Sequence, residues 1–245
     1  FTTGVNTVTY GNAGDQDIIT GIYTGQLVIS GSGTKTLQGN IPVTGNITIG
    51  GTTTLDLAGN TITSSGDITV QNNSTLEVDA GSQLLIANTR TLSNNGSLSI
   101  VGTAGNEAII SRNGGAGGYS IVQADASAEI HAQYYQFEYL SGGITVSAGQ
   151  INNTNNFSNG TFTNSSGTEY MNITGIDVSG LPNITNAVFD AGPTYNITRS
   201  SGTGTVTLTD ASGALSGENF DNDNGNPGTL INWSYPASTF YSTGN

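Results

Sequence analysis

Two carboxylates stand at equivalent places in a repeated phrase. Thr54-Leu55-Asp56-Leu57 returns as Thr75-Leu76-Glu77-Val78, so that Asp56 and Glu77 are 21 residues apart. Carboxylates on neighbouring turns of a chain could serve as the acid and base of a glycoside hydrolase. Apolar residues flank both, however, and strand alternation then puts the two carboxylates in an outward polar ladder. This pattern favours a structural role for Asp56 and Glu77 rather than a catalytic one.

A polysaccharide lyase would need a basic residue to take a proton and further cations to hold the substrate's carboxylates. The chain has only four cations, far apart in the sequence: Lys35, Arg90, Arg112 and Arg199. Such an activity would depend on Arg112 or Glu138. We predict no catalytic residues, and a lyase or hydrolase is the third hypothesis for function.

Asp221 to Asn226 reads DNDNGN, with oxygen ligands at alternate positions as in the first half of a calcium loop. Asn226 stands where such a loop has Gly, and Asn232 where it has Glu. A solvated turn is therefore the favoured interpretation, and calcium bound by Asp221 and Asp223 is the alternative. No other cofactor is predicted.

The most aromatic stretch is Ala128 to Leu140. Unbroken alternation would place His131, Gln133, Tyr135, Phe137 and Tyr139 on one face, and Ala132, Tyr134, Gln136 and Glu138 on the other. A stripe over Tyr134–Tyr139 could bind sugar rings or a neighbouring subunit. The favoured interpretation is that the rings fill the core. His131 has no nucleophile beside it and makes no triad.

Two further sets of residues are candidates for contacts and modification. Aromatic and apolar residues gather at both ends, where a solenoid needs caps or joints; they are Phe1, Val5, Tyr10, Trp233, Tyr235, Phe240 and Tyr241. Possible glycosylation triplets begin at Asn46, Asn95, Asn159, Asn172, Asn183, Asn196 and Asn232, although a chain rich in Asn, Ser and Thr contains many by chance.

The elements that position these residues follow from one recurring phrase: a small polar residue, Gly, a polar residue, then apolar-polar-apolar. Clear copies have their glycines at Gly25, Gly45, Gly66 and Gly96, and looser copies follow. The spacings are 20, 21 and 30 residues, and the longest predicts an insertion between Gly66 and Gly96 within one column of equivalent positions. Each copy predicts a short strand with one buried face, bounded by residues that tolerate positive-φ bends. A strand that returns every twenty-odd residues, with others between, predicts an all-β, single-stranded parallel β-helix.

Coils of roughly 20 to 25 residues predict ten or eleven turns and a rod about 50 Å long. We expect one solenoid domain over 1–245, with regular coils over about 23–150, irregular coils over 151–229 and an aromatic tail over 230–245. The loose stretch GTAGNEAIISRNGGAGGYSIVQ predicts a loop at Arg112 to Gly118. A β-helix followed by a β-sandwich is the alternative.

SGSGTKTLQGNIPVTGNITIGGTTTLDLAGNTIT, from Ser30 to Thr63, resembles the β-helical repeat regions of bacterial secreted and outer-surface proteins of the adhesin and autotransporter type. FDNDNGNPGTLINWSYP, from Phe220 to Pro236, is similar to the end of such modules in Bacteroidota-type surface proteins. The resemblance covers about Tyr23 to Ile100 well and the rest weakly. It implies export, a right-handed winding and a role at the cell surface, and it carries no catalytic residues.

Composition excludes several partners. The 17 acids and four cations give a net charge of -13, so there is no basic stripe for nucleic acid or an anionic membrane. No apolar run approaches the ~20 residues of a membrane span. The chain starts at Phe1 with no apolar leader, as expected of a mature exported protein or a trimmed chain.

We therefore expect a non-enzymatic, secreted structural protein of the cell surface that assembles head to tail into a filament or layer. The second hypothesis is an adhesin module that binds carbohydrate or another surface, with surface glycans as partners.

Overall fold

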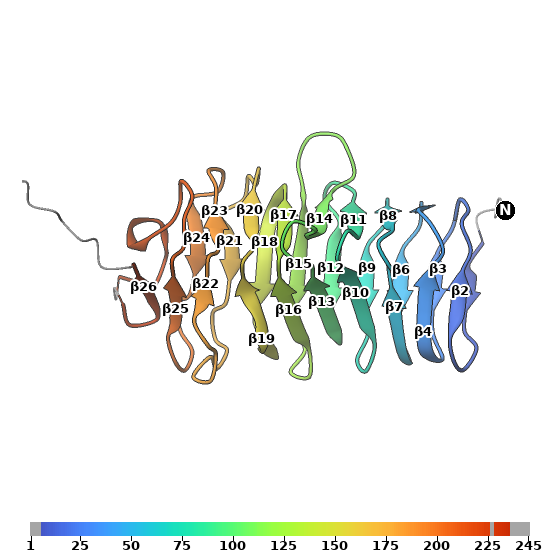
Figure 1. The fold of residues 1–245 in the computed structure, drawn as a ribbon, viewed down its shortest axis with the longest axis horizontal. Helices are drawn as coiled ribbons and strands as arrows, with labels where there is room; N and C mark the ends of the chain where they lie inside the picture. The colour runs from blue at the N-terminus through green and yellow to red at the C-terminus, as the bar shows by residue number, and fades with distance from the viewer. Residues whose placement is uncertain (1–5, 226–227, 236–245) are drawn as a thin grey trace, which may run out of the picture.

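A computed structural model describes residues 6–225 and 228–235. These residues form 26 short strands and one 3₁₀ helix, η1 (Glu218–Phe220). The strands pair into three long sheets and one short sheet, and every strand pair is parallel. The described chain is a β-solenoid of about 10 turns, as the repeat predicts (Figure 1).

Apart from the first and last turns, each turn contributes one strand to each of the three faces of the rod. The first sheet contains β1 (Val8–Tyr10), β3 (Leu27–Ile29), β6 (Ile47–Ile49), β9 (Ile68–Val70), β12 (Thr91–Asn94), β15 (Tyr119–Gln123), β18 (Leu140–Val146), β21 (Glu169–Asn172) and β24 (Tyr195–Thr198). The second contains β2 (Gln16–Ile18), β4 (Ser32–Leu37), β7 (Thr52–Asp56), β10 (Thr75–Asp79), β13 (Ser97–Val101), β16 (Glu129–Gln133) and β19 (Gln150–Ser158). The third contains β5 (Ile41–Val43), β8 (Thr61–Ser64), β11 (Gln83–Ile86), β14 (Ala108–Arg112), β17 (Tyr135–Glu138), β20 (Thr161–Thr163) and β23 (Val188–Phe189). The short fourth sheet, β22 (Ile184–Thr185), β25 (Val206–Thr209) and β26 (Ile231–Ser234), follows β19 near the C-terminal end.

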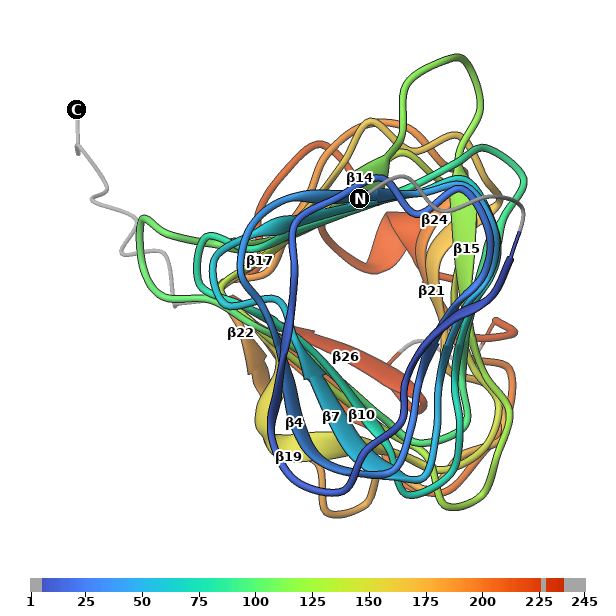
Figure 2. The same ribbon diagram turned by 90° about the vertical axis from the view of Figure 1, so that its right-hand side faces the viewer.

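Seen from the N-terminal end, the turns superpose in a three-sided outline (Figure 2). As the chain recedes from the viewer it passes clockwise, from the first sheet on the right to the second below and the third above (Figure 2). A clockwise path that recedes is a right-handed winding, which agrees with the expectation from the resemblance.

The register confirms the repeat where its period is short. Ile47 of β6 pairs with Ile68 of β9, and Leu55 of β7 pairs with Leu76 of β10. The copy at Gly96 is different. It precedes β13 in the second sheet, whereas Gly45 and Gly66 precede strands of the first, and the partner of Ile68 is Leu92. Placing Gly96 in the same column was therefore wrong, because the phrase encodes a bend followed by a half-buried strand at more than one edge of the rod.

The glycines of the phrase have a different role from the one predicted. Gly25, Gly45 and Gly66 are absent from the residues with positive φ. Instead they stack on one another: a Cβ atom on Gly66 would lie 2.4 Å from the carbonyl oxygen of Gly45, and one on Gly45 would lie 2.6 Å from that of Gly25. Glycine is retained in this column because successive backbones approach too closely for any side chain.

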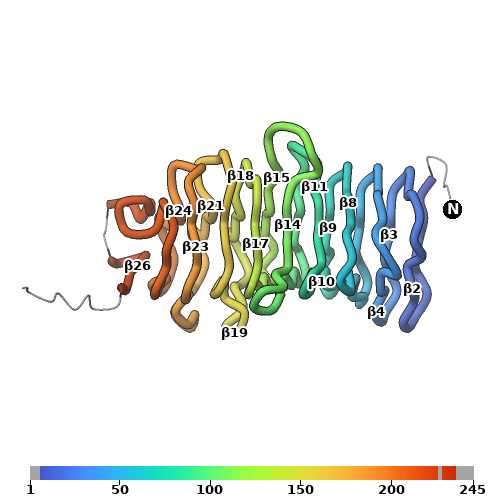
Figure 3. Tube along the Cα trace, turned by 45° about the horizontal axis from the view of Figure 1, so that its top comes forward, coloured from blue at the N-terminus to red at the C-terminus, as the bar shows by residue number. Residues whose placement is uncertain are grey.

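The core changes character along the rod. Up to about β14 it is filled mainly by Ile, Leu and Val in strands with an alternating burial pattern. From β17 onward aromatic rings fill much of the core. Phe162 lies at its centre, stacked on Phe189 (5.2 Å between centroids, 4° between planes) and on Phe137 (5.4 Å). A projecting loop, residues 113–118, joins β14 to β15, where the glycine-rich stretch predicts one (Figures 1 and 3).

The predicted alternation across Ala128 to Leu140 was wrong. Tyr134 has φ +49° and separates β16 from β17, so His131 is outward while Tyr135 and Phe137 are fully buried. Tyr139, at φ +61°, is again only half-buried. Two bends thus split the expected stripe, and the two inward rings fill the core as the favoured interpretation held.

Candidate functional sites

The N-terminal end of the rod is an open edge within the described residues. There β1 pairs only with β3, β2 only with β4, and Tyr23 forms a single bridge with Val43. Ile19 and Ile22 of this first turn are each 51% exposed. Of the residues predicted for an interface here, Tyr10 packs against the core edge and its hydroxyl lies 2.8 Å from that of Tyr23; Phe1 and Val5 lie outside the described residues.

A buried lysine holds the first turn in place. Lys35 is inward in β4 and fully buried, opposite Gln16 of the first turn and Leu55 of the third. Its Nζ donates to the carbonyl oxygens of Asn12 (2.9 Å) and Ser32 (3.0 Å) and also to that of Gly14. The ammonium group therefore satisfies backbone acceptors rather than a carboxylate.

A buried arginine does the same near the other end. Arg199 is fully buried, and its two terminal nitrogens donate to four carbonyl oxygens, those of Ile173, Ile176, Thr203 and Gly204, at 2.7–3.2 Å. Burial lowers the pKa of Arg199, and the charge of Asp177 partly opposes that shift. The composition gave no sign that two of the four cations are internal, because an isolated Lys or Arg usually lies at the surface.

The C-terminal turn carries the remaining interface candidates. The ring of Trp233 meets Phe189 edge to face at 6.0 Å, and its Nε1 donates to Asp221 Oδ2 at 2.6 Å. Tyr235 is 53% exposed and Phe220 36% exposed. Phe240 and Tyr241 lie outside the described residues. The sequence therefore located this apolar surface in part, and it missed Phe220.

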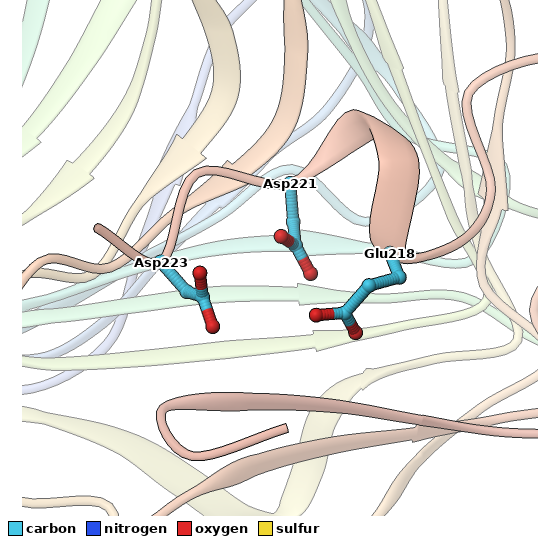
Figure 4. A group of neighbouring side chains, drawn as sticks. All are labelled: Glu218, Asp221 and Asp223. Atoms are coloured by element: carbon cyan, nitrogen blue, oxygen red, sulfur yellow. The ribbon is translucent and has the colours of Figure 1, made fainter. Parts of the chain in front are cut away.

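The candidate calcium residues belong to a group of three carboxylates in the same turn. Ligand atoms of Asp221, Asp223 and Glu218 lie within 4.8 Å of one another, and their side chains point towards a common space (Figure 4). Glu218, three residues before the DNDNGN motif, was not predicted. Burial raises the pKa of Asp221 to about 6, against a hydrogen bond from Trp233 that lowers it. Three oxygen donors could start a calcium shell, which needs six to eight.

The carboxylate pair Asp56 and Glu77 is placed as predicted, on partner positions of the outer face. Burial raises the pKa of both, and each also feels a neighbouring carboxylate: Asp79 for Asp56, and both Asp56 and Asp79 for Glu77. Two hollows, of about 290 and 250 Å³, lie elsewhere and contain one carboxylate each, Asp177 and Glu129. Neither hollow has the carboxylate pair that a glycosidase needs.

Two half-buried tyrosines mark one place on the flank of the rod. Tyr134 and Tyr139 bound β17, whose outward Gln136 and Glu138 share a hydrogen bond (2.8 Å). The Arg112 guanidinium lies 3.8 Å from the centre of the Tyr139 ring. In the next two turns Asn159 and Asn186 follow Tyr134 at the same bend, with φ +57° and +54°. Tyrosine in this backbone conformation is uncommon, and such positions concentrate at functional sites.

The predicted glycosylation residues differ in access. Asn46, Asn183 and Asn232 are exposed, and Asn95, Asn159 and Asn172 are half-buried. Asn196 is fully buried and its amide donates to the carbonyl oxygens of Leu215 and Gly217. Its burial disfavours a glycan on Asn196 in the folded protein.

Within the part of the chain that is described, no helix has the length and hydropathy to cross a membrane. Comparison with protein-family models, curated proteins and solved structures found no match to this chain.

Proposed function

We propose that this chain is a non-enzymatic structural protein of the cell surface whose β-helical copies associate head to tail. The observation that carries the proposal is the position of the exposed hydrophobic side chains at the two ends of the rod. Four large hydrophobic side chains are exposed among the described residues, and all lie in the first or the last turn: Ile19, Ile22, Phe220 and Tyr235. Exposed hydrophobic surface gathered in this way is typical of contact sites.

The backbone favours the same conclusion. Within the described residues each sheet ends in an unpaired strand, and an open parallel edge can pair with another chain. The flanks carry most of the 17 acids, and this negative charge disfavours side-by-side association. A contact between unlike ends does not close on itself, so it builds filaments rather than dimers. Location outside the cell is supported by the resemblance of Ser30 to Thr63 to secreted repeat regions.

Sedimentation velocity over a hundredfold range of concentration tests the association. We expect the weight-average sedimentation coefficient to rise with concentration and keep rising past that of a dimer. A single monomeric boundary at every concentration would refute the proposal. Digestion of intact source cells with an added protease tests location, since a surface protein is degraded and an internal one is spared.

A second candidate function is carbohydrate binding on the flank. It is favoured by the half-buried Tyr134 and Tyr139 on either side of the outward Gln136 and Glu138. Sugar rings pack on aromatic faces, and planar polar groups form hydrogen bonds with sugar hydroxyls. A glycan array tests it with the wild type and with Tyr139→Ala. The matched control is Tyr195→Ala, which removes another half-buried tyrosine. Binding lost only in Tyr139→Ala supports the site, and binding to no glycan contradicts it.

A further inference from the structure

The fourth sheet continues the side of the rod formed by the second sheet, because β22 lies next to β19. The first strand of this side, β2, and its last strand, β26, present complementary backbone groups. In parallel sheets alternate residues bond to opposite neighbours. The carbonyl of Ile18 accepts from Gln38 of the next turn, so the N–H and C=O of Asp17 face the open side of β2. At the other end the carbonyls of Leu230 and Ser234 accept from the preceding turn.

The backbone groups of Ile231 and Trp233, which lie between those two residues, therefore face the open side of β26. If β2 of a second copy lies on β26, the N–H of Asp17 meets the carbonyl of Ile231, and its C=O meets the N–H of Trp233. Side chains match in the same register. Ile18 would then face the half-buried Trp233, and Gln16 would face the fully buried Ile231, all on the inner face, whereas Asp17 and Asn232 are exposed and outward. The hydrophobic core would continue across the joint.

Three rotational settings are open to a three-sided rod, and β26 is the most regular edge of the last turn. The other two sides of that turn form single bridges, at Ser212 and at Asn222. The first is followed by Gly213 at φ +98° and the second by Asn224 at φ +63°, so neither continues as a strand.

Charge favours the same setting. Asp15 and Asp17 belong to the side of β2, whereas Glu218, Asp221 and Asp223 surround Asn222, which bridges to β24 of the first sheet. Placing β2 on β26 keeps the two acidic groups on different sides of the rod. Rotating the second copy by one side of the rod, so that β2 lies on Asn222, would bring the five carboxylates together. Their mutual repulsion in a partly buried joint would be unfavourable.

Given the proposed head-to-tail association, we infer that β2 of each copy pairs in parallel with β26 of the preceding copy, with Asp17 opposite Asn232. The partner is a second copy of this chain in one fixed rotation.

The chain contains no cysteine, so a disulfide can report this contact alone. Asp17→Cys and Asn232→Cys are combined in one variant. Facing residues on adjacent strands lie about 4.8 Å apart, within the range that a disulfide spans. Within one copy the two positions are at opposite ends of the rod (Figure 1). The matched control combines Asp17→Cys with Ser99→Cys, an outward position of the same sheet in mid-rod.

Under mild oxidation we expect a ladder of covalent oligomers from the 17/232 variant, and no species beyond a dimer from the control. If the wild type associates in sedimentation but the two variants give the same pattern, the inferred register is overturned while the proposed function stands. If the wild type is monomeric, both fail.

A second variant tests the joint without cysteine. Asp17→Pro removes the N–H that faces the open side, and proline is tolerated at such edge positions within a fold. We expect an intact fold by circular dichroism and at least tenfold weaker association. Unchanged association would contradict the pairing.

Discussion

Replacing Lys35 by methionine tests how the first turn is held. Methionine preserves the inward apolar stem but removes the ammonium group that serves the carbonyls of Asn12, Gly14 and Ser32. Asn12 and Gly14 belong to the first turn, which touches only one other turn, so the loss should fall there rather than on the whole rod.

The expected cost is a difference of opposing terms. Three hydrogen bonds from a charged donor, at about 1.5–3 kcal/mol each, give about 5–9 kcal/mol. Removing the ammonium group also removes its desolvation penalty of several kcal/mol. We expect a net loss of about 2–4 kcal/mol in the free energy of opening the first turn. Since 1.4 kcal/mol is a factor of ten, amide exchange across that turn should accelerate roughly 30- to 700-fold.

Hydrogen exchange provides the assay. The amides of Ser30 and Gln38 donate to Tyr10 and Ile18 and report opening of the first turn, while the amide of Gln71 reports a turn farther along. We expect Lys35→Met to accelerate exchange at Ser30 and Gln38 and to leave Gln71 nearly unchanged.

The matched control is Leu55→Met, which puts the same residue at the partner position in the next turn. It should accelerate exchange only slightly, because a volume-conserving swap costs under about 1.5 kcal/mol. Exchange in Lys35→Met that stays within threefold of the wild type at Ser30, or that speeds up equally in every turn, would refute the reasoning.

Four further predictions concern the core, pH, calcium and glycans. Phe162→Ala should lower the free energy of unfolding by about 3–5 kcal/mol in urea titration, because it empties the centre of the ring stack; a loss below about 1 kcal/mol would contradict that packing. Because the pKa of Asp221 rises from 3.8 to about 6 on folding, its contribution to stability is present below pH 4 and lost as pH rises through 6; the melting temperature of Asp221→Asn should therefore gain on the wild type over this window, and a constant difference would count against it. If the acidic turn binds calcium, millimolar calcium should raise the melting temperature of the wild type and not that of Asp223→Asn. Equal responses of the two proteins would contradict a calcium site and indicate a solvated turn. Glycan mapping by mass spectrometry should find Asn196 unmodified in the folded protein, and an occupied Asn196 would contradict its burial.

The parallel winding could be predicted because every turn has the same requirement for buried apolar residues. Every turn must bury one face of three short strands, so apolar residues return at Ile47 and Ile68 with polar residues between them. The column assignment failed at Gly96 because each bend makes a similar demand, and a local phrase does not say which side of the rod follows it.

Other features depend on contacts between distant turns. The bend at Tyr134 has a positive φ, which is usual for Asn or Gly and rare for Tyr. There is therefore no sign of a bend in the sequence, and the predicted alternation continues through it. Lys35 and Arg199 are buried because backbone carbonyls surround them, and no neighbouring acid marks them in the sequence. Glu218 joins Asp221 and Asp223 through η1, which has no pattern of its own in the sequence.

Cryo-electron microscopy of the concentrated protein tests stacking and association together. We predict unbranched filaments with a layer line near 4.8 Å along the axis and a subunit repeat close to 50 Å, the rise of about ten turns. Isolated rods at every concentration, or filaments whose strands do not repeat along the axis, would contradict the account.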